Sequence, residues 1–278
     1  MFKKLRLEDA GITPVLGAMF ILGIGISVIA VFLAAWVPSE FNTKKREYMQ
    51  SARESFRELS ATIEDLSVGE SRTISLKMGP ETIPFVINPK VSGTLSVTST
   101  PSENYLNGMW INGENYNGEN YPGNIKFDME NQSVVYEMGL IALVQGKVVL
   151  MESAPQMVTV FAAAGNMIGV YVDVIKVRGV ERSISGSGMS TITVSILRRF
   201  EKTENRENAV IKINTRYKDA WMDYLSTENA ALNADNFNAS LGTENNLLTL
   251  TIKGKDNSSG VKDIIYYQKV TEVWVSIS

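Results

Sequence analysis

The residues that could do chemistry in this 278-residue chain are carboxylates, lysines, arginines and tyrosines, because the chain contains no histidine and no cysteine. That absence removes the most common general base, the thiol nucleophile, disulfide bonds and nearly all zinc chemistry. Glu152, Asp173 and Glu181 lie near apolar runs, but no pair of carboxylates has a spacing typical of acid–base catalysis. We therefore expect no enzymatic activity, no metal and no cofactor. A carboxylate enzyme outside the cell remains the alternative, and a pocket with converging acids would support it.

The charges of the chain are dispersed and nearly balanced. It has 27 lysines and arginines against 30 aspartates and glutamates, which gives a formal net charge of −3. Nucleic-acid-binding proteins concentrate positive charge on one face, so this composition predicts no nucleic-acid partner. Five basic residues could still gather on neighbouring strands, although a solvated sheet face explains them equally: Lys176, Arg178, Arg182, Arg198 and Arg199.

A short repeat carries the most distinctive polar and aromatic side chains. The sequence Asn-Gly-Glu-Asn-Tyr occurs twice in succession from residue 112. Asn-Gly pairs favour tight turns because both residues accept a positive φ. We expect an exposed loop there that presents four aromatic residues, namely Tyr105, Trp110, Tyr116 and Tyr121. Aromatic rings beside amides suit carbohydrate, so surface glycans are candidate partners; a solvated insertion between strands is the alternative.

Three Asn-X-Ser sequons follow the apolar segment described next, at Asn131, Asn238 and Asn257. Each lies in a turn-like stretch, where an exported protein can carry a glycan. Chance supplies one or two sequons in a chain rich in asparagine and serine. They are candidate glycosylation sites.

Residues 12–37 form an unbroken, uncharged apolar run behind a short charged leader. A helix of this length spans the hydrocarbon core of a bilayer, about 30 Å thick. A secretory signal would have a shorter apolar region followed by small residues at its cleavage site. Here Trp36 and Pro38 close the run, and the small residues Ala10 and Gly11 precede it. A cut at that place would remove the leader and leave the helix on the mature protein.

The stretch Glu8-Asp9-Ala10-Gly11-Ile12-Thr13-Pro14-Val15-Leu16-Gly17 resembles the N-terminus of archaeal type IV pilin-like proteins, which carry class III signal peptides. The resemblance implies cleavage by a prepilin peptidase between Gly11 and Ile12, or between Ala10 and Gly11. It also implies association with other pilin subunits through the apolar helix. The chain departs from bacterial pilins at Leu16, where those proteins usually carry glutamate. The resemblance is specific over the leader and the apolar run and looser beyond them.

Small residues inside the apolar run would let helices approach closely, in lipid or in a filament core. The glycines of this set are Gly17, Gly23 and Gly25. Glycine is common in membrane helices, so a plain anchor that never polymerises remains the alternative.

Residues 38–66 predict an amphipathic stalk helix. Its apolar positions are three or four residues apart, which places them on one face: Tyr48, Ala52, Phe56, Leu59, Ile63 and Leu66. We expect this face to pack on the following domain. Pro38, which cannot donate a backbone hydrogen bond, should kink the helix or restart it.

Residues 67–278 read as a β-rich domain, with β-branched or alternating runs separated by Gly, Pro and Asn turns. The run from Ser183 to Ile196 predicts a pair of strands around Gly186-Ser187-Gly188. One short helix is expected from Tyr217 to Ser226, with Ala220, Trp221, Tyr224 and Leu225 buried. The fold class is therefore α+β, with a mainly antiparallel β domain, as one large unit or two small ones.

Together these segments predict a leader (1–11), a transmembrane or filament-core helix (12–37), a stalk (38–66) and an extracellular domain (67–278). Basic residues on the two sides of the span nearly balance, so charge leaves the orientation open. Export of the large domain is the simpler arrangement, which puts the N-terminus in the cytoplasm. We expect a cell-surface or pilus subunit, present in low copy as a minor pilin with a role in adhesion or surface interaction. A signal-anchored binding protein that does not polymerise is the alternative.

Overall fold

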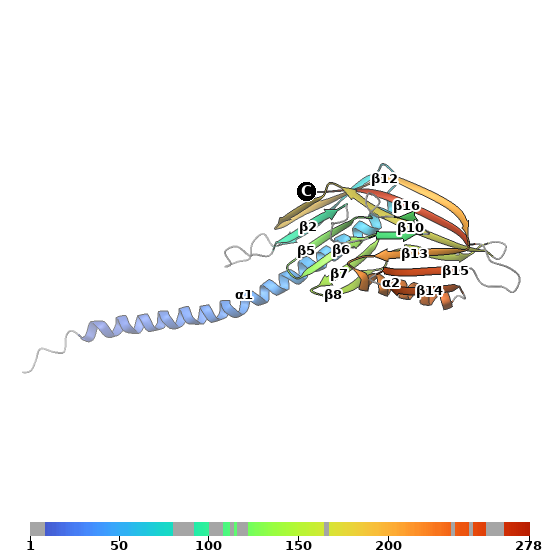
Figure 1. Cartoon of the computed structure of the whole chain (residues 1–278). Helices are drawn as coiled ribbons and strands as arrows, with labels where there is room; N and C mark the ends of the chain where they lie inside the picture. Colours follow the sequence, from blue (N-terminus) through green and yellow to red (C-terminus); the bar gives the residue numbers. More distant parts are fainter. Residues whose placement is uncertain are drawn as a thin grey trace, which may run out of the picture.

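The computed structural model describes residues 9–79, 92–99, 108–111, 114–115, 122–163, 167–234, 237–244, 247–253 and 264–278. A long N-terminal helix, α1 (Asp9–Asp65), is followed by a β domain that includes one further helix, α2 (Lys218–Ala234). This confirms the predicted α+β layout. Figure 1 shows the first part of α1 standing free of the β domain and its last part lying against the sheets.

Helix α1 has 57 residues, a length of about 85 Å at 1.5 Å per residue. It is one continuous helix through Pro38, so of the two predicted effects of this proline, a kink or a restart, the restart does not occur. Figure 1 shows a bend between the free and the packed part, the effect expected where a proline removes one helical hydrogen bond. The helix ends where the Glu70 carboxylate accepts a bond from the Ser67 amide, at 2.7 Å, and Gly69 adopts a φ of 86°. Glycine accepts this left-handed conformation without a steric penalty.

The first sheet, sheet 1, contains the longest strands. In spatial order they are β1 (Ser71–Gly79), β12 (Gly188–Arg206), β16 (Ile264–Ile277), β10 (Ile168–Gly179) and β9 (Val158–Ala162). Strands β10 and β16 pair in parallel, and the other pairs in the described sheets are antiparallel. The mainly antiparallel prediction is therefore confirmed.

Sheet 2 contains β11 (Arg182–Gly186), β2 (Gly93–Thr98), β5 (Asn124–Met129), β6 (Gln132–Glu137), β7 (Leu140–Gln145) and β8 (Val148–Ser153) in spatial order. Strand β11 pairs with β2 in sheet 2, whereas β12 pairs with β1 in sheet 1. The prediction that the strands on the two sides of Gly186-Ser187-Gly188 pair with each other is therefore wrong. The chain passes from one sheet to the other at these glycines, where Gly188 adopts a φ of 87°.

Sheet 3 contains β14 (Asn238–Glu244), β15 (Leu247–Lys253), β13 (Asn208–Asn214), β3 (Gly108–Ile111) and β4 (Glu114–Asn115) in spatial order. Helix α2 lies against β14 and β15 and also against β8 of sheet 2. It is longer than predicted at its C-terminal end. Its four predicted core residues are all buried: Ala220, Trp221, Tyr224 and Leu225.

A buried carboxylate attaches the start of α2 to sheet 2. Glu137, at the end of β6, accepts hydrogen bonds from the Thr215 hydroxyl at 2.7 Å and the Trp221 indole at 2.8 Å. Burial raises the pKa of Glu137, and the two hydrogen bonds oppose that shift. The adjacent turn places Met138 and Gly139 at positive φ, 52° and 87°, the pattern of a tight hairpin turn.

Two hydrophobic cores share the strands of sheet 1. The α1 core contains the packed half of α1, one face of sheet 2 and the C-terminal half of β16, including Val273, Val275 and Ile277. The α2 core contains α2, sheet 3 and the N-terminal half of β16, including Ile264 and Tyr266. Since side chains alternate along a strand, these odd and even residues lie on opposite faces. Sheet 1 therefore buries opposite faces at its two ends.

Candidate functional site

The N-terminal half of α1 is apolar on every side and is covered by nothing in the described chain. Its large side chains from Val15 to Phe32 are 49–75% exposed, and no part of its most apolar window is buried. By length and composition the helix can cross a membrane. An amphipathic surface helix would show one apolar stripe instead. This segment therefore requires an apolar environment, and the described residues of the chain do not provide one.

The predicted cleavage and helix-packing positions fall within this half. Gly11 and Ile12 lie in the first turns of α1, and their side chains are outside the described part of the structure. A Cβ atom added at Gly17, Gly23 or Gly25 would meet no atom within 4 Å. The three glycines are thus free to face another helix, and their packing role stays a prediction.

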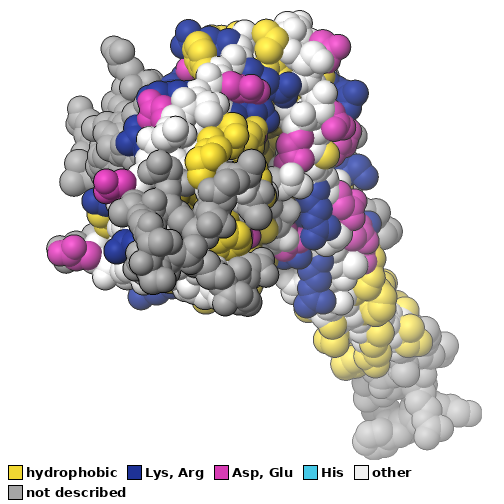
Figure 2. Space-filling view, turned by 90° about the vertical axis from the view of Figure 1, so that its right-hand side faces the viewer, with side chains coloured by type: hydrophobic (Ala, Val, Ile, Leu, Met, Phe, Trp, Pro, Cys, Tyr) yellow, Lys and Arg dark blue, Asp and Glu magenta, His cyan; other side chains and the backbone are white. Residues whose placement is uncertain are grey.

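The C-terminal half of α1 has the opposite character. The predicted stripe is confirmed for five of its six residues: Ala52, Phe56, Leu59 and Ile63 are 0–1% exposed, and Leu66 is also buried. The sixth, Tyr48, is partly buried and packs against the edge of the same core. Met49 is a buried residue that the predicted stripe omitted. The outer side of this half carries charges of both signs, and Figure 2 shows them giving way to hydrophobic side chains on the free part of the helix.

Ion pairs attach the rim of this half to sheet 2. Lys45 pairs with Glu130 at 2.6 Å, in the turn between β5 and β6. Arg57 pairs with Glu152 of β8, also at 2.6 Å, and Arg53 lies 4.0 Å from the same carboxylate. Glu152, one of the acids considered for catalysis, therefore belongs to the attachment of the helix.

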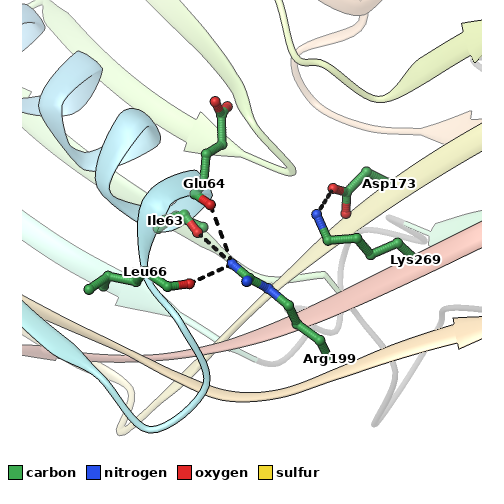
Figure 3. A network of polar contacts seen from close by, with 6 residues as sticks. All are labelled: Ile63, Glu64, Leu66, Asp173, Arg199 and Lys269. Atoms are coloured by element: carbon green, nitrogen blue, oxygen red, sulfur yellow. Dashed lines mark hydrogen bonds and ion pairs between the residues drawn. The ribbon is translucent and has the colours of Figure 1, made fainter.

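Arg199 of β12 holds the last turn of α1 from the side of sheet 1. Its Nη2 atom donates to the carbonyl oxygens of Leu66 at 2.7 Å, Ile63 at 3.3 Å and Glu64 at 3.4 Å (Figure 3). The final carbonyls of a helix lack partners within the helix and carry its negative dipole end, so a guanidinium suits them. Arg199 therefore acts as a C-cap supplied by a distant strand.

Next to this cap lies a pocket of about 290 Å³. It opens between the end of α1, the β6–β7 turn and sheet 1, and its polar lining comprises Glu64, Gln156, Thr159, Tyr171, Asp173 and Lys269. Asp173 and Lys269 are register partners on β10 and β16, and their side chains pair at 2.6 Å. Figure 3 shows this pair and the Arg199 cap as neighbouring but separate groups.

Partial burial controls the ionisation of the pocket acids. It raises the pKa of Asp173, whereas the hydrogen bond and charge of Lys269 oppose the shift. Burial, and then the negative charge of Asp173, raise the pKa of Glu64. The Asp173 Oδ1 atom is buried and has no hydrogen-bond partner in the described chain. The pocket thus contains two acids, but one of them is already paired with a lysine.

The predicted surface sites are only partly within the described residues. Tyr105, Tyr116, Tyr121 and the sequon at Asn257 lie outside them. Trp110 lies in strand β3, paired with Lys212 of β13, rather than in the expected loop. The stretch therefore contributes a strand to sheet 3, which the turn signals of the repeat obscured.

The two described sequons differ in setting. Asn131 is exposed in the turn between β5 and β6, as predicted. Asn238 is also exposed, but it is the first residue of strand β14 and not part of a turn. Its side chain is on the face of β14 opposite to that of the buried Ala239.

The five basic residues do not form one patch. Three of them share one carboxylate, since Lys176 and Arg198 lie 3.9 and 2.6 Å from Glu272 and Arg178 also acts on its charge. The other two lie elsewhere, because Arg199 caps α1 and Arg182 donates to the Ile277 carbonyl. Within the described ranges, no group of three or more acidic side chains could hold a metal ion. The pocket was missed because Lys269 and Glu64 are far from Asp173 in sequence; only the register of β10 and β16 brings the pair together.

The model of one protein family, described as a family of unknown function (DUF7289), matches residues 11–246. The match begins just before the apolar run and includes all but the first two residues of α1, the whole of α2 and most of the strands. No curated protein and no solved structure matches the chain.

Proposed function

The chain belongs to DUF7289, a family of unknown function, and we propose that it is a membrane-anchored, pilin-like surface subunit. The first half of α1 spans the membrane after the leader is removed, and the β domain lies outside the cell. During assembly the same half would move from lipid into a bundle of helices from other subunits. The size of the β domain favours a minor, low-copy subunit with a role in adhesion or surface interaction.

One observation supports this proposal above the others. A single helix contains an uncovered half that is apolar all round and a second half fixed to the β domain by a buried stripe. A helix that only anchored the chain could end at the membrane surface. Continuation into the domain attaches the span to the domain without a linker, which suits an assembly whose core is made of helices.

The first test is the mass of the N-terminus of the protein isolated from its native membrane. A mature chain that starts at Ile12 or Gly11 would support prepilin processing, and an intact leader would contradict it. Gly11→Leu should block the cut while keeping the apolar run. Gly23→Leu adds the same side chain outside the stretch that resembles the processing motif and should leave the cut unchanged.

A second test separates a pilin from an anchor. Because the chain has no cysteine, a cysteine introduced at Gly23 would report contact between apolar helices of two subunits. Gly23→Cys should give disulfide-linked dimers on mild oxidation in cells. Gln50→Cys, on the exposed side of the packed half, is the matched control and should give fewer. Equal and low yields from both variants would favour the non-polymerising anchor.

A further inference from the structure

One face of sheet 1 is left open beside the pocket. Along the N-terminal half of β16, Tyr266 and Gln268 face the α2 core and are buried, whereas Ile265, Tyr267 and Lys269 on the other face are only partly buried. The α1 core covers this second face only farther along the strand. No described element lies over it next to the pocket.

Three aromatic rings lie on this open face on adjacent strands. Phe161 of β9 is directly opposite Gly169, and Tyr171 of β10 is opposite Tyr267 of β16. Residues that are directly opposite each other share a face of the sheet. The rings of Phe161 and Tyr267 have centroids 5.9 Å apart and are tilted by 30°. The two rings in contact and the neighbouring Tyr171 lie on one face of three adjacent strands, and we call these three residues the aromatic shelf.

Gly169 explains how the shelf is held. A Cβ atom at this position would lie 2.3 Å from the Phe161 ring, so the ring lies directly against the backbone of β10. Its other side remains in solvent, and Phe161 is 42% exposed. Aromatic side chains that combine an apolar ring with a polar end, as Tyr171 and Tyr267 do, are enriched at binding interfaces.

The pocket continues the shelf with hydrogen-bonding groups. Tyr171 belongs to both, and Thr159, Gln156, Asp173 and Lys269 lie around it. Together they offer hydroxyl, amide, carboxylate and ammonium groups, which are both donors and acceptors. The volume of about 290 Å³ is at the lower end of ligand pockets, so it suits a small molecule or one unit of a chain.

The charges of the pocket lining indicate which class of ligand it can bind. Asp173 and Lys269 neutralise each other at 2.6 Å, and the Arg199 Nη2 atom is engaged by three helix carbonyls. Glu64, whose side chain is exposed, is the remaining ionisable carboxylate in the lining. A site with so little net charge gives no strong preference to an anion or to a polycation. It favours an uncharged ligand with many hydroxyl groups and an apolar face.

We propose that the pocket and the aromatic shelf bind a hexose unit of a glycan. The apolar face of the sugar ring would lie on Tyr171, and its hydroxyls would bond Asp173, Lys269, Gln156 and Thr159. Phe161 and Tyr267 extend the shelf, so they would contact a neighbouring sugar unit. This site is distinct from the aromatic loop predicted from the repeat, and it does not rest on cleavage or polymerisation.

The test uses the full chain in a detergent without a sugar headgroup, such as lauryldimethylamine oxide. Saturation-transfer NMR would be recorded with methyl glycosides of glucose, galactose, mannose and N-acetylglucosamine, and with putrescine as a cationic comparison. We expect signal transfer to at least one glycoside. Asp173→Asn should weaken that binding about tenfold, because a bond to a charged group becomes one to a neutral group. Tyr171→Ala should weaken it by a similar factor, whereas Tyr171→Phe, which keeps the ring, should retain most of it.

The matched control is Trp274→Ala. Trp274 is an aromatic residue of the same strand β16, 40% exposed, on the opposite face of sheet 1. Its removal should leave binding unchanged. Thermal unfolding of each variant checks that the fold is intact. Glycoside binding by all variants is then compared at the same folded fraction. Absence of binding by every glycoside, binding that is equally lost in Trp274→Ala, or binding of putrescine alone would overturn the proposal.

Discussion

The two halves of α1 share one backbone and differ in what surrounds them. From Val15 to Phe32 every side of the helix is apolar and exposed, whereas from Met49 to Leu66 one stripe is buried and the outer side is charged. The lesson is that the distribution of apolar residues around a helix, and not their number, indicates its environment. The apolar stripe of the packed half is buried against the chain's own sheets. A helix that is apolar all round requires lipid or other helices.

The largest effect should come from charging the free half. The double variant Ile24→Lys/Val28→Lys places two ammonium groups near the middle of the span, at a cost to membrane insertion of about 5–7 kcal/mol. We expect the protein to be lost from carbonate-washed membranes. Gln50→Lys adds the same side chain to the exposed side of the packed half, where it should change neither location nor folding. Retention of the double variant in the membrane would contradict the claim that the free half lies in the hydrocarbon core.

Removing bulk from the packed half should destabilise the β domain. Phe56 is fully buried in the α1 core, so Phe56→Ala should lower the free energy of unfolding by about 3–5 kcal/mol. The measurement is chemical unfolding of the detergent-solubilised chain, followed by tryptophan fluorescence. Phe20→Ala removes the same group from the free half, where Phe20 is 71% exposed. It should leave unfolding of the domain unchanged; a similar loss in both variants would contradict the distinction between the halves.

Much of this contrast is predictable from sequence because it depends on local periodicity. The positions of Ala52, Phe56, Leu59 and Ile63 follow from helical geometry alone, and so does the uninterrupted run from 12 to 37. At Pro38 the local rules allow either a kink or a restart, and the structure shows one continuous helix with a bend.

The pocket depends on pairings that sequence does not reveal. Asp173 and Lys269 meet only through the parallel register of β10 and β16, and Arg199 reaches α1 from a strand 133 residues away from Leu66. The separation of β11 and β12 into different sheets is another non-local choice. Alternation identifies a strand, but it does not identify the neighbour of that strand.

The end of the packed half offers a smaller and sharper test. Arg199→Met keeps much of the side-chain volume but removes the donors to the Ile63, Glu64 and Leu66 carbonyls. We expect a loss of about 2 kcal/mol in the free energy of unfolding, because bonds from a charged group are lost. Hydrogen exchange should rise in the last turn of α1. Arg198→Met, which changes the adjacent residue on the other face of β12, should leave exchange in α1 unchanged.

The ionisation of Glu137, which bonds Trp221 of α2, gives a prediction for the attachment of the second helix. Burial raises the pKa of Glu137, so the folded protein holds this proton to higher pH than the unfolded chain does. The associated stability is complete below the ordinary pKa of 4.5 and is lost as the pH rises through the folded value. Glu137→Gln should therefore flatten the decline in stability above pH 4.5, measured as unfolding midpoints across pH. Glu204→Gln should have the opposite sign, because Lys202 and Arg206 lower the pKa of Glu204; its contribution is lost as the pH falls.

The smallest expected effect lies at the boundary between the two halves. Lys45 is the ion-paired residue nearest the span that connects α1 to sheet 2, through Glu130 at 2.6 Å. A double-mutant cycle with Lys45→Met and Glu130→Gln should give a coupling energy of about 0.2–1 kcal/mol, which falls as salt is added. The 0–1% exposures of the stripe indicate that burial holds the helix on the domain. The Lys45–Glu130 pair then affects only the direction in which the span leaves the domain. A coupling of several kcal/mol would instead make the boundary, and not the stripe, the main attachment of the helix.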